Sequence, residues 1–213
     1  MNWLGRFRKS RPAVDETRWV VLDVETSGLD AGRDRLLAVA AIAMRVDWGR
    51  KRLAIVPGDS FEVVLRQHEA SEPDNILLHG IGAQRQRSGV PASEALRSLR
   101  DYAGRSPLVA FHAAFDRRMI ERHMHPALGT EWSPAWVDIE QLCAATHEGV
   151  AARSLDEWMA HFGVRCALRH QAAADTLAEC ELLLRIWPRL AAECGNWRDV
   201  ERLAARHRWI ARA

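Results

Sequence analysis

Short apolar runs and amphipathic stretches alternate along most of the chain. Apolar, β-branched runs that are too short for helices predict buried strands. Such runs occur at residues 19–22, 36–46, 52–56 with 61–65, 107–111 and 136–138. Because Pro57-Gly58 interrupts the third of them, this part of the chain predicts either one strand or a hairpin.

Apolar side chains at helical spacing mark the segments between and after these runs. The pattern predicts helices at residues 91–103, 113–124, 155–162, 171–187 and 198–209. Ser154 and Glu157 form a capping box at the start of the third helix, and Pro188 is expected to end or kink the fourth. Because most strands come first and most helices last, the order predicts a mixed sheet covered by helices.

The length of 213 residues favours one domain with small additions. We interpret residues 1–18 as a basic N-terminal extension, residues 19–190 as the main domain and residues 191–213 as a helical tail. The longest purely apolar run, residues 36–44, is far shorter than the roughly 20 residues of a membrane helix, so we expect no membrane partner. Because the first ten residues lack the apolar core of a secretory signal, we expect a cytoplasmic protein.

Charge and cysteine content add little to this picture. The net charge of +2 is weak evidence for a polyanionic partner. Within residues 1–11, Trp3, Leu4 and Phe7 alternate with basic residues, which suits a nucleic-acid arm or a segment packed near Trp209. We favour packing, because exposed apolar clusters lower solubility. The four cysteines lack metal-site spacing and are expected to be small buried residues.

Two carboxylates stand at the end of the first predicted strand. Asp23 and Glu25 are two positions apart, so a strand projects both to the same side. Two adjacent acids repel one another unless a cation lies between them, and Mg²⁺ prefers such oxygen ligands. The residues before Asp23 are all apolar, which favours a ligand site at the carboxyl end of a buried strand over a solvent-facing strand end. Gly28, two residues after Thr26, lets the backbone come close to a ligand.

Three further residues fit the same chemistry. Asp116 falls in the first turn of the helix after residues 107–111, where it is either a helix-stabilising acid or a third metal carboxylate. His170 and Asp175 are five residues apart and cannot share one helical face. We therefore expect His170 on the loop before a helix and Asp175 one turn inside it. A mobile imidazole beside a fixed carboxylate suits a general base.

Asp23, Glu25, Asp116, His170 and Asp175, in this order and spacing, resemble the DEDDh 3′–5′ exonucleases. Similar patterns occur in the proofreading epsilon subunit of bacterial DNA polymerase III and its stand-alone homologues. The matching stretches are VLDVETSGLD, ILLHGIG, FHAAFD and RHQAAADT. The resemblance implies an α/β ribonuclease H-like fold, with a five-stranded mixed sheet flanked by helices, and identifies residues 19–190 as an exonuclease domain.

The resemblance also implies a set of site residues. Two divalent metal ions, Mg²⁺ or Mn²⁺, would be held by Asp23, Glu25, Asp116 and Asp175, with His170 as general base. Thr26, Leu29 and His79 would lie against the terminal nucleotide. Two departures bear on substrate preference: Phe111-His112 replaces the usual His-Asn, and Gly82 stands where the family often has Thr. His112 can still donate a hydrogen bond at that position.

The implied function is a metal-dependent 3′–5′ exonuclease that releases nucleoside monophosphates from single-stranded nucleic acid. We expect DNA as the preferred substrate. An exoribonuclease of the oligoribonuclease type and a polymerase-associated proofreading subunit remain alternatives. A polymerase partner gains no support from residues 188–213, which look helical and lack a Q-x-x-[L/M]-x-F clamp motif. The presence of all five DEDDh residues argues against a binding module without catalysis, and the oligomeric state stays open.

Overall fold

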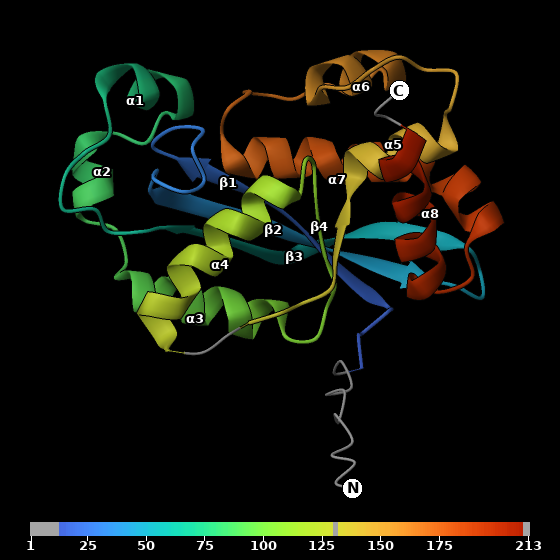
Figure 1. Ribbon diagram of the computed structural model, residues 1–213, viewed down its shortest axis with the longest axis horizontal. Coiled ribbons are helices and arrows are strands. Elements are labelled where there is room, and N and C mark those ends of the chain that lie inside the picture. Colours follow the sequence, from blue (N-terminus) through green and yellow to red (C-terminus); the bar gives the residue numbers. More distant parts are fainter. Residues whose placement is uncertain (1–12, 130–131, 211–213) are drawn as a thin grey trace, which may run out of the picture.

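The computed structural model describes residues 13–129 and 132–210, with the side chains of residues 207–210 left out. Within these described residues, five strands form one sheet in the order β3-β2-β1-β4-β5 (Figure 1). The first three strands pair antiparallel, whereas β4 and β5 run parallel to β1. The strands are β1 (Arg18–Thr26), β2 (Leu36–Asp47), β3 (Arg52–Val64), β4 (Leu108–Ala110) and β5 (Trp136–Asp138). The predicted five-stranded mixed sheet is confirmed.

The third predicted strand is one long edge strand and not a hairpin. Along β3 the pairing with β2 shifts, because Ser60 lies opposite Ile42 whereas Ile55 lies opposite Met44. Pro57 and Gly58 fall in this irregular stretch, where Gly58 has a φ of 82°. An edge strand tolerates such a bulge, since its outer hydrogen-bonding groups need no partner strand.

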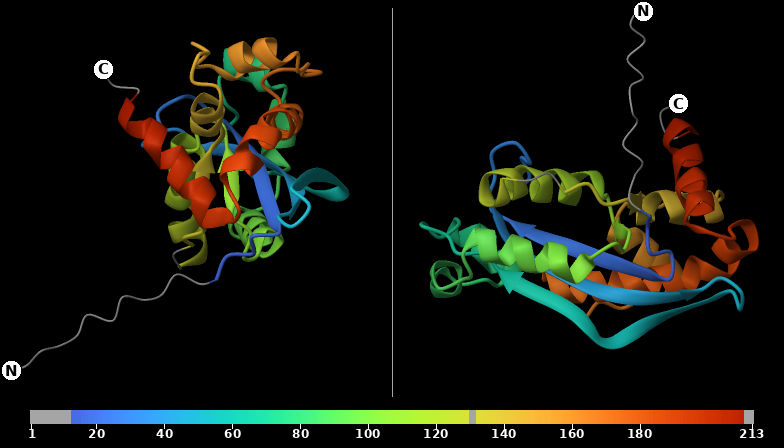
Figure 2. Two further views of the ribbon diagram at one scale, coloured as in Figure 1. Left: turned by 90° about the vertical axis from the view of Figure 1, so that its right-hand side faces the viewer. Right: turned by 90° about the horizontal axis from the view of Figure 1, so that it is seen from below.

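Helices cover both faces of the sheet (Figures 1 and 2). All five predicted helices are confirmed within a few residues, although α4 and α7 extend further than expected. Three shorter helices, α1, α2 and α5, were not predicted. The helices are α1 (Pro73–His79), α2 (Ala83–Arg87), α3 (Ala92–Ala103), α4 (Ala114–Leu128), α5 (Ile139–Thr146), α6 (Leu155–Phe162), α7 (Ala172–Glu193) and α8 (Trp197–Ile210).

Helix α7 continues through Pro188, so this proline does not end the helix. Ile186, Trp187 and Leu190 are buried on either side of the proline. Burial of this apolar face offsets the roughly 3 kcal/mol that an interior proline costs a helix. The expected boundary at residue 190 therefore falls inside α7, and α8 packs against α5 and β5 as part of the same body.

The alternation of side chains along β1 builds two hydrophobic layers. Trp19 and Val21 belong to the layer under α5, α7 and α8, whereas Val20 and Leu22 belong to the layer under α3 and α4. The indole of Trp19 contacts the indole of Trp197 edge-on, with ring centroids 5.1 Å apart. This packing makes β1 the rigid centre of the sheet and sets the position of the residues at its carboxyl end.

Three further expectations concern residues 1–11, the cysteines and membrane-spanning helices. Residues 1–11, with their predicted packing near Trp209, lie outside the described residues and side chains. Cys143, Cys180 and Cys194 are buried as free thiols, whereas Cys166 is only partly buried. Over residues 13–129 and 132–210, no helix combines the length and apolar character that crossing a bilayer demands.

Candidate active site

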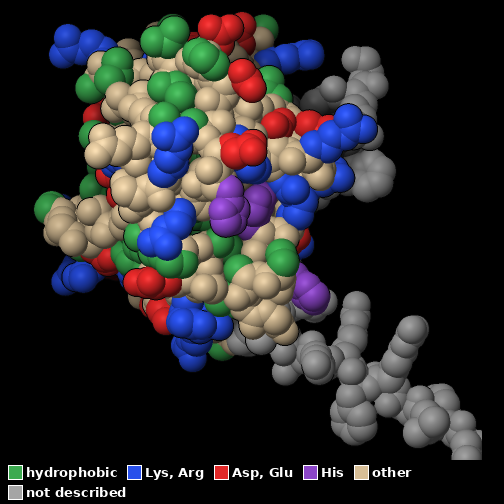
Figure 3. All heavy atoms as spheres, turned by 90° about the vertical axis from the view of Figure 1, so that its left-hand side faces the viewer, with side chains coloured by type: hydrophobic (Ala, Val, Ile, Leu, Met, Phe, Trp, Pro, Cys, Tyr) green, Lys and Arg blue, Asp and Glu red, His purple; other side chains and the backbone are tan. Residues whose placement is uncertain are grey.

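A cavity of about 580 Å³ opens at the carboxyl end of β1. Its walls come from β1, from the loop between β4 and α4, and from the start of α7. Figure 3, which faces the left-hand edge of Figure 1, shows histidine, acidic and basic side chains gathered on this side of the molecule. The acidic residues that line it are Asp23, Glu25, Asp116, Asp156, Asp175 and Glu179.

The structure brings together all four carboxylates that the sequence singled out. Val24 is buried in the layer under α3 and α4, so Asp23 and Glu25 project to the opposite side of β1, toward α7. Asp116 lies in the first turn of α4 and is only 3% exposed. Asp175 lies in the first turn of α7 and is 5% exposed. Three separate elements thus contribute to one acidic cluster.

Burial, with repulsion between neighbouring acids, raises the pKa values of Asp23, Glu25 and Asp116. Burial raises the pKa of Asp23 to about 8, and the neighbouring charge of Asp175 adds to the shift. Burial and repulsion from Asp23 raise the pKa of Glu25 to about 9. The pKa of Asp116 is also raised well above its usual value, chiefly by burial. Glu25 Oε1 is buried without a hydrogen-bond partner. The cluster favours either bound protons or a bound cation.

Asp175 is already engaged by protein groups. The guanidinium of Arg169 forms an ion pair with it, and Arg169 Nε also donates to Asp156 Oδ1 at 2.6 Å. The backbone N–H of His170 donates to Asp175 Oδ2 at 2.9 Å. The thiol of Cys166 lies 3.4 Å from Asp175 Oδ1. Asp175 is therefore held in place by groups that precede it in the chain.

The donor set fits a hard divalent cation. Its ligands are carboxylate oxygens, which Mg²⁺ and Mn²⁺ prefer, and two of them, Glu25 Oε1 and Glu179 Oε2, are buried without partners. As the side chains stand, no three Asp, Glu, His or Cys residues in the described part of the chain converge on one point as a metal site. Rotation of Arg169 away from Asp175 would free the carboxylate with which its guanidinium now forms an ion pair.

His170 lies where the sequence predicted, on the loop before α7. It is exposed, lines the cavity and has a φ of 62°, a left-handed conformation that is uncommon outside glycine. Its backbone N–H is bonded to Asp175, whereas the residue is exposed at the cavity. The side chain can therefore change rotamer while its backbone stays fixed.

His112 lines the same cavity from the loop between β4 and α4. Its φ is 54°, and its backbone N–H donates to Asp138 Oδ1 at 3.1 Å. Its Nε2 lies 3.2 Å from the carbonyl oxygen of Arg153, so Nε2 carries the hydrogen and Nδ1 is left for another donor. Burial raises the pKa of Asp138 to about 6, and Asp138 also caps α5 by accepting from Glu140 N.

The structure places only some of the residues expected to contact the nucleotide at the cavity. Thr26 and Leu29 line the cavity, and Leu29 is 91% exposed. His79 does not line it, because this residue is buried at the end of α1. Its Nε2 bonds to Asn75 Oδ1 at 2.9 Å, and its Nδ1 accepts from Ile81 N. Asn75 does reach the cavity and donates to the carbonyl oxygen of Thr26 at 3.0 Å.

Sequence reasoning missed several residues that line this cavity. Asn75 directly precedes the ILLHGIG stretch and Arg169 directly precedes His170. Neither residue type indicated a site by itself. Glu179 did carry a signal, because it is an acid one helical turn after Asp175 and is followed on that face by Leu182, Leu183 and Ile186. Gly82, the other departure from the family pattern, caps α2 and does not line the cavity.

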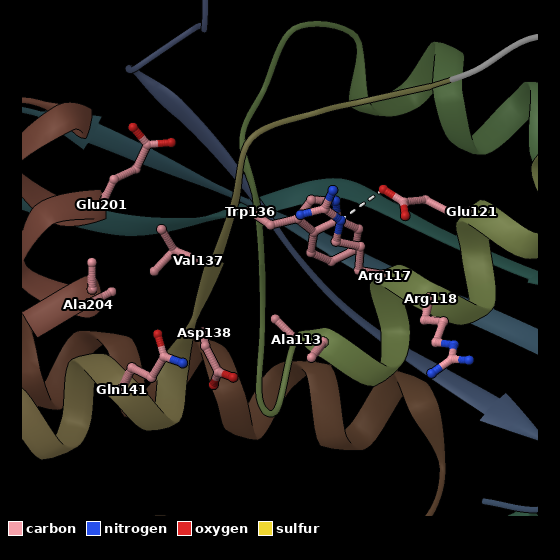
Figure 4. Close-up of a pocket in the computed structure, with 12 residues that line it drawn as sticks. Ala113, Arg117, Arg118, Glu121, Trp136, Val137, Asp138, Gln141, Glu201 and Ala204 are labelled. Carbon is pink, nitrogen blue, oxygen red and sulfur yellow. Dashed lines mark hydrogen bonds and ion pairs between the residues drawn. The ribbon is translucent and has the colours of Figure 1, made fainter. Parts of the chain in front are cut away.

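A second cavity, of about 470 Å³, lies between α4, β5, α5 and α8 (Figure 4). Arg117, Trp136 and Gln141 line it together with small side chains of α8. Arg117 is paired with Glu121 at 2.8 Å. This cavity lacks the cluster of buried acids, so the candidate chemistry belongs to the first cavity.

Comparison with known proteins agrees with this geometry. The RNase_T family, described as "Exonuclease", matches residues 20–183. The chain is 29% identical over 195 residues to a DNA polymerase III subunit epsilon-like protein of Rhodobacter capsulatus, covering 89% of this chain and 27% of that protein. It is 26% identical over 174 residues to the PolC-type DNA polymerase III of Bacillus subtilis, covering 81% of this chain and 12% of the polymerase. The chain thus spans only a small part of these relatives.

Solved structures share the fold at low sequence identity. Escherichia coli exonuclease I in complex with a dT13 oligonucleotide superimposes with a TM-score of 0.65 and 18% identity, covering 82% of this chain and 42% of that one. Exonuclease X in complex with 5′ overhanging duplex DNA gives a TM-score of 0.59 and 20% identity, covering 79% and 90%. These neighbours confirm the expected ribonuclease H-like fold. The match over residues 20–183 shows that the chain belongs to the RNase_T exonuclease family.

Proposed function

We propose that this chain is a metal-dependent 3′–5′ exonuclease that releases nucleoside monophosphates from single-stranded nucleic acid, with DNA preferred. The observation that carries the proposal is the cavity at the end of β1, where half-buried Asp23 and Glu25 and buried Asp116 and Asp175 lie with an exposed His170. Membership of an exonuclease family supports the reaction class. Structural neighbours solved with dT13 and with DNA duplexes support DNA over RNA.

In this proposal the four carboxylates hold two divalent cations, Mg²⁺ or Mn²⁺. Bound cations of this kind stabilise charge on the attacking and leaving oxygens of a phosphodiester and lower the pKa of the attacking water. Asp23 and Glu25 enter from the rigid central strand, so their positions depend on the core and not on a loop. Arg169 must leave Asp175 before that carboxylate can serve as a ligand.

The remaining residues of the cavity orient substrate and move a proton. His170 takes the proton from the attacking water, and its exposed imidazole is free to swing across the opening. Leu29 packs against the terminal base, because its apolar side chain projects almost fully from the cavity wall. Thr26 and His112 contact the sugar-phosphate backbone. His79 acts only through Asn75, which it holds against the end of β1.

A polymerase-associated proofreading role is the second candidate. The relatives named epsilon-like protein and PolC are far longer than the matched region, which is the observation that favours it. An exoribonuclease of the oligoribonuclease type shares the same site chemistry, and the 2′-OH is what separates the two substrates.

The test uses single-stranded DNA and RNA of one sequence, each labelled at the 5′ end. With Mg²⁺ or Mn²⁺ we expect a ladder that shortens one nucleotide at a time and keeps its 5′ label, and no cleavage in EDTA. Faster digestion of RNA would reverse the substrate preference. Immediate release of the 5′ label, or cleavage that EDTA does not affect, would overturn the proposed reaction.

A further inference from the structure

Glu179 is a buried acid in the catalytic cavity that the DEDDh pattern does not include. It lies one helical turn after Asp175 on α7, so both side chains leave the helix on the same face. Glu179 is 1% exposed and lines the same cavity as the four motif carboxylates. It is therefore the fifth buried or half-buried carboxylate of the cluster, placed one turn deeper than Asp175.

The carboxylate of Glu179 lacks the partners that a structural acid requires. Its Oε2 is buried with no hydrogen-bond partner among the described residues. The charged groups that affect it most are the acids Asp23 and Asp116, and one backbone hydrogen bond comes from Phe111. An uncompensated buried carboxylate costs several kcal/mol, whereas an apolar side chain of similar volume would fill the same space without that cost. Packing alone does not account for an acid here.

The net charge of the carboxylate cluster favours a role in cation binding for Glu179. Within the described residues, the five carboxylates are contacted by one cation only, Arg169, which pairs with Asp175. When all five are ionised, one arginine compensates only one of the five negative charges, so the cluster strongly favours bound cations. Glutamate is one methylene longer than aspartate, so it can reach toward Asp23 and Asp116 from its deeper position on α7.

We propose that Glu179 is a fifth metal-binding carboxylate of this site, and that its free Oε2 holds a divalent cation directly or through one of the cation's water molecules. The inference rests on the proposed function, because it assigns Glu179 to the cation site that the four motif acids form. It makes α7 contribute two acids, Asp175 and Glu179, and β1 two others.

The test measures Mn²⁺ affinity by calorimetric titration and by the paramagnetic resonance signal of free Mn²⁺. Glu179→Gln keeps the shape and removes the charge, and we expect about 10- to 100-fold weaker binding of at least one ion. Glu179→Asp keeps the charge on a shorter side chain and should fall between. The matched control is Glu181→Gln, which removes one charge from the same helix outside the cavity and should bind Mn²⁺ like the wild type.

Melting temperatures separate metal binding from packing. In EDTA, Glu179→Gln should melt at or above the wild-type temperature, since an uncompensated acid is gone, whereas the gain on adding Mn²⁺ should shrink. Wild-type Mn²⁺ affinity in Glu179→Gln, with the wild type itself binding, overturns this inference and leaves the proposed function standing. A wild type that binds no Mn²⁺ overturns both.

Discussion

Arg169 forms an ion pair with Asp175, and the next residue along the chain, His170, donates its backbone N–H to the same carboxylate. The guanidinium of Arg169 is therefore paired with a carboxylate that the family resemblance assigns to metal binding. Because Arg169 also donates to the exposed Asp156, it has an alternative partner when it leaves Asp175. In the proposed site, a metal ion can use this carboxylate only after Arg169 has left it.

Arg169→Met should strengthen Mn²⁺ binding about tenfold in the absence of substrate, since removal of a competing charged hydrogen bond is worth about 1.5–3 kcal/mol and exposure reduces that value. Calorimetric titration measures the change. Arg165→Met is the control, because Arg165 is exposed and does not line the cavity. Weaker Mn²⁺ binding in Arg169→Met would mean that Arg169 supports the metal site and does not compete with it.

Asp23→Asn should fold normally but lose at least about 10²-fold in activity, because metal clamps on a phosphodiester are worth several kcal/mol. The burial that raises the pKa of Asp23 to about 8 means that a neutral amide does not destabilise the fold. Thermal melting and the oligonucleotide assay decide together. A variant that folds and keeps wild-type activity contradicts the assignment of Asp23 to the metal site.

His170→Ala should lower kcat by about 10²–10⁴-fold while Mn²⁺ affinity stays close to that of the wild type. A general base acts on the water and not as a ligand, and this imidazole is exposed at the cavity opening. Loss of Mn²⁺ binding in this variant would identify His170 as a ligand.

The metal-free protein should lose stability as the pH rises toward 9. Burial raises the folded-state pKa of Asp23 to about 8 and that of Glu25 to about 9, so the folded state keeps protons that the unfolded chain has already released. This contribution is complete below the unfolded pKa of about 4 and falls by about 1.4 kcal/mol per pH unit for each retained proton until the folded pKa is passed.

Divalent cations should reverse that trend, because they bind the ionised acids. Melting curves in EDTA and in Mn²⁺ from pH 6 to 9 check the sign: the metal-induced rise in Tm should grow with pH. Asp23→Asn, with one acid fewer, should show a shallower decline in EDTA. A metal-free Tm that increases across this range would contradict the raised pKa values.

Leu29→Ser should raise KM for single-stranded DNA about fivefold, since loss of an apolar contact of this size removes about 1 kcal/mol, with kcat and Tm little changed. The side chain is 91% exposed, so the fold does not depend on it. Leu77→Ser is the matched control, because Leu77 is 82% exposed but does not line the cavity. An equal KM effect in both variants would exclude a specific contact between Leu29 and the terminal base.

Local patterns in the sequence were enough to predict the strands, five of the helices and the loop position of His170. Periodicity depends on neighbouring residues alone, and the capping box at Ser154 and Glu157 is likewise local, so α6 was predicted to the residue. Order and spacing also sufficed to select Asp23, Glu25, Asp116 and Asp175. These signals need no knowledge of what lies across the molecule.

Tertiary packing decided the rest. Pro188 sits inside α7 because buried residues on both sides of it stabilise the helix, and His79 turns into the protein because Asn75 and Ile81 satisfy its ring nitrogens. The cluster itself joins a central strand to helices that begin about 90 and 150 residues later in the chain. Whether Glu179 is an exposed acid or a buried one in that cluster depends on which face of α7 meets the sheet, and only the packed structure determines that face.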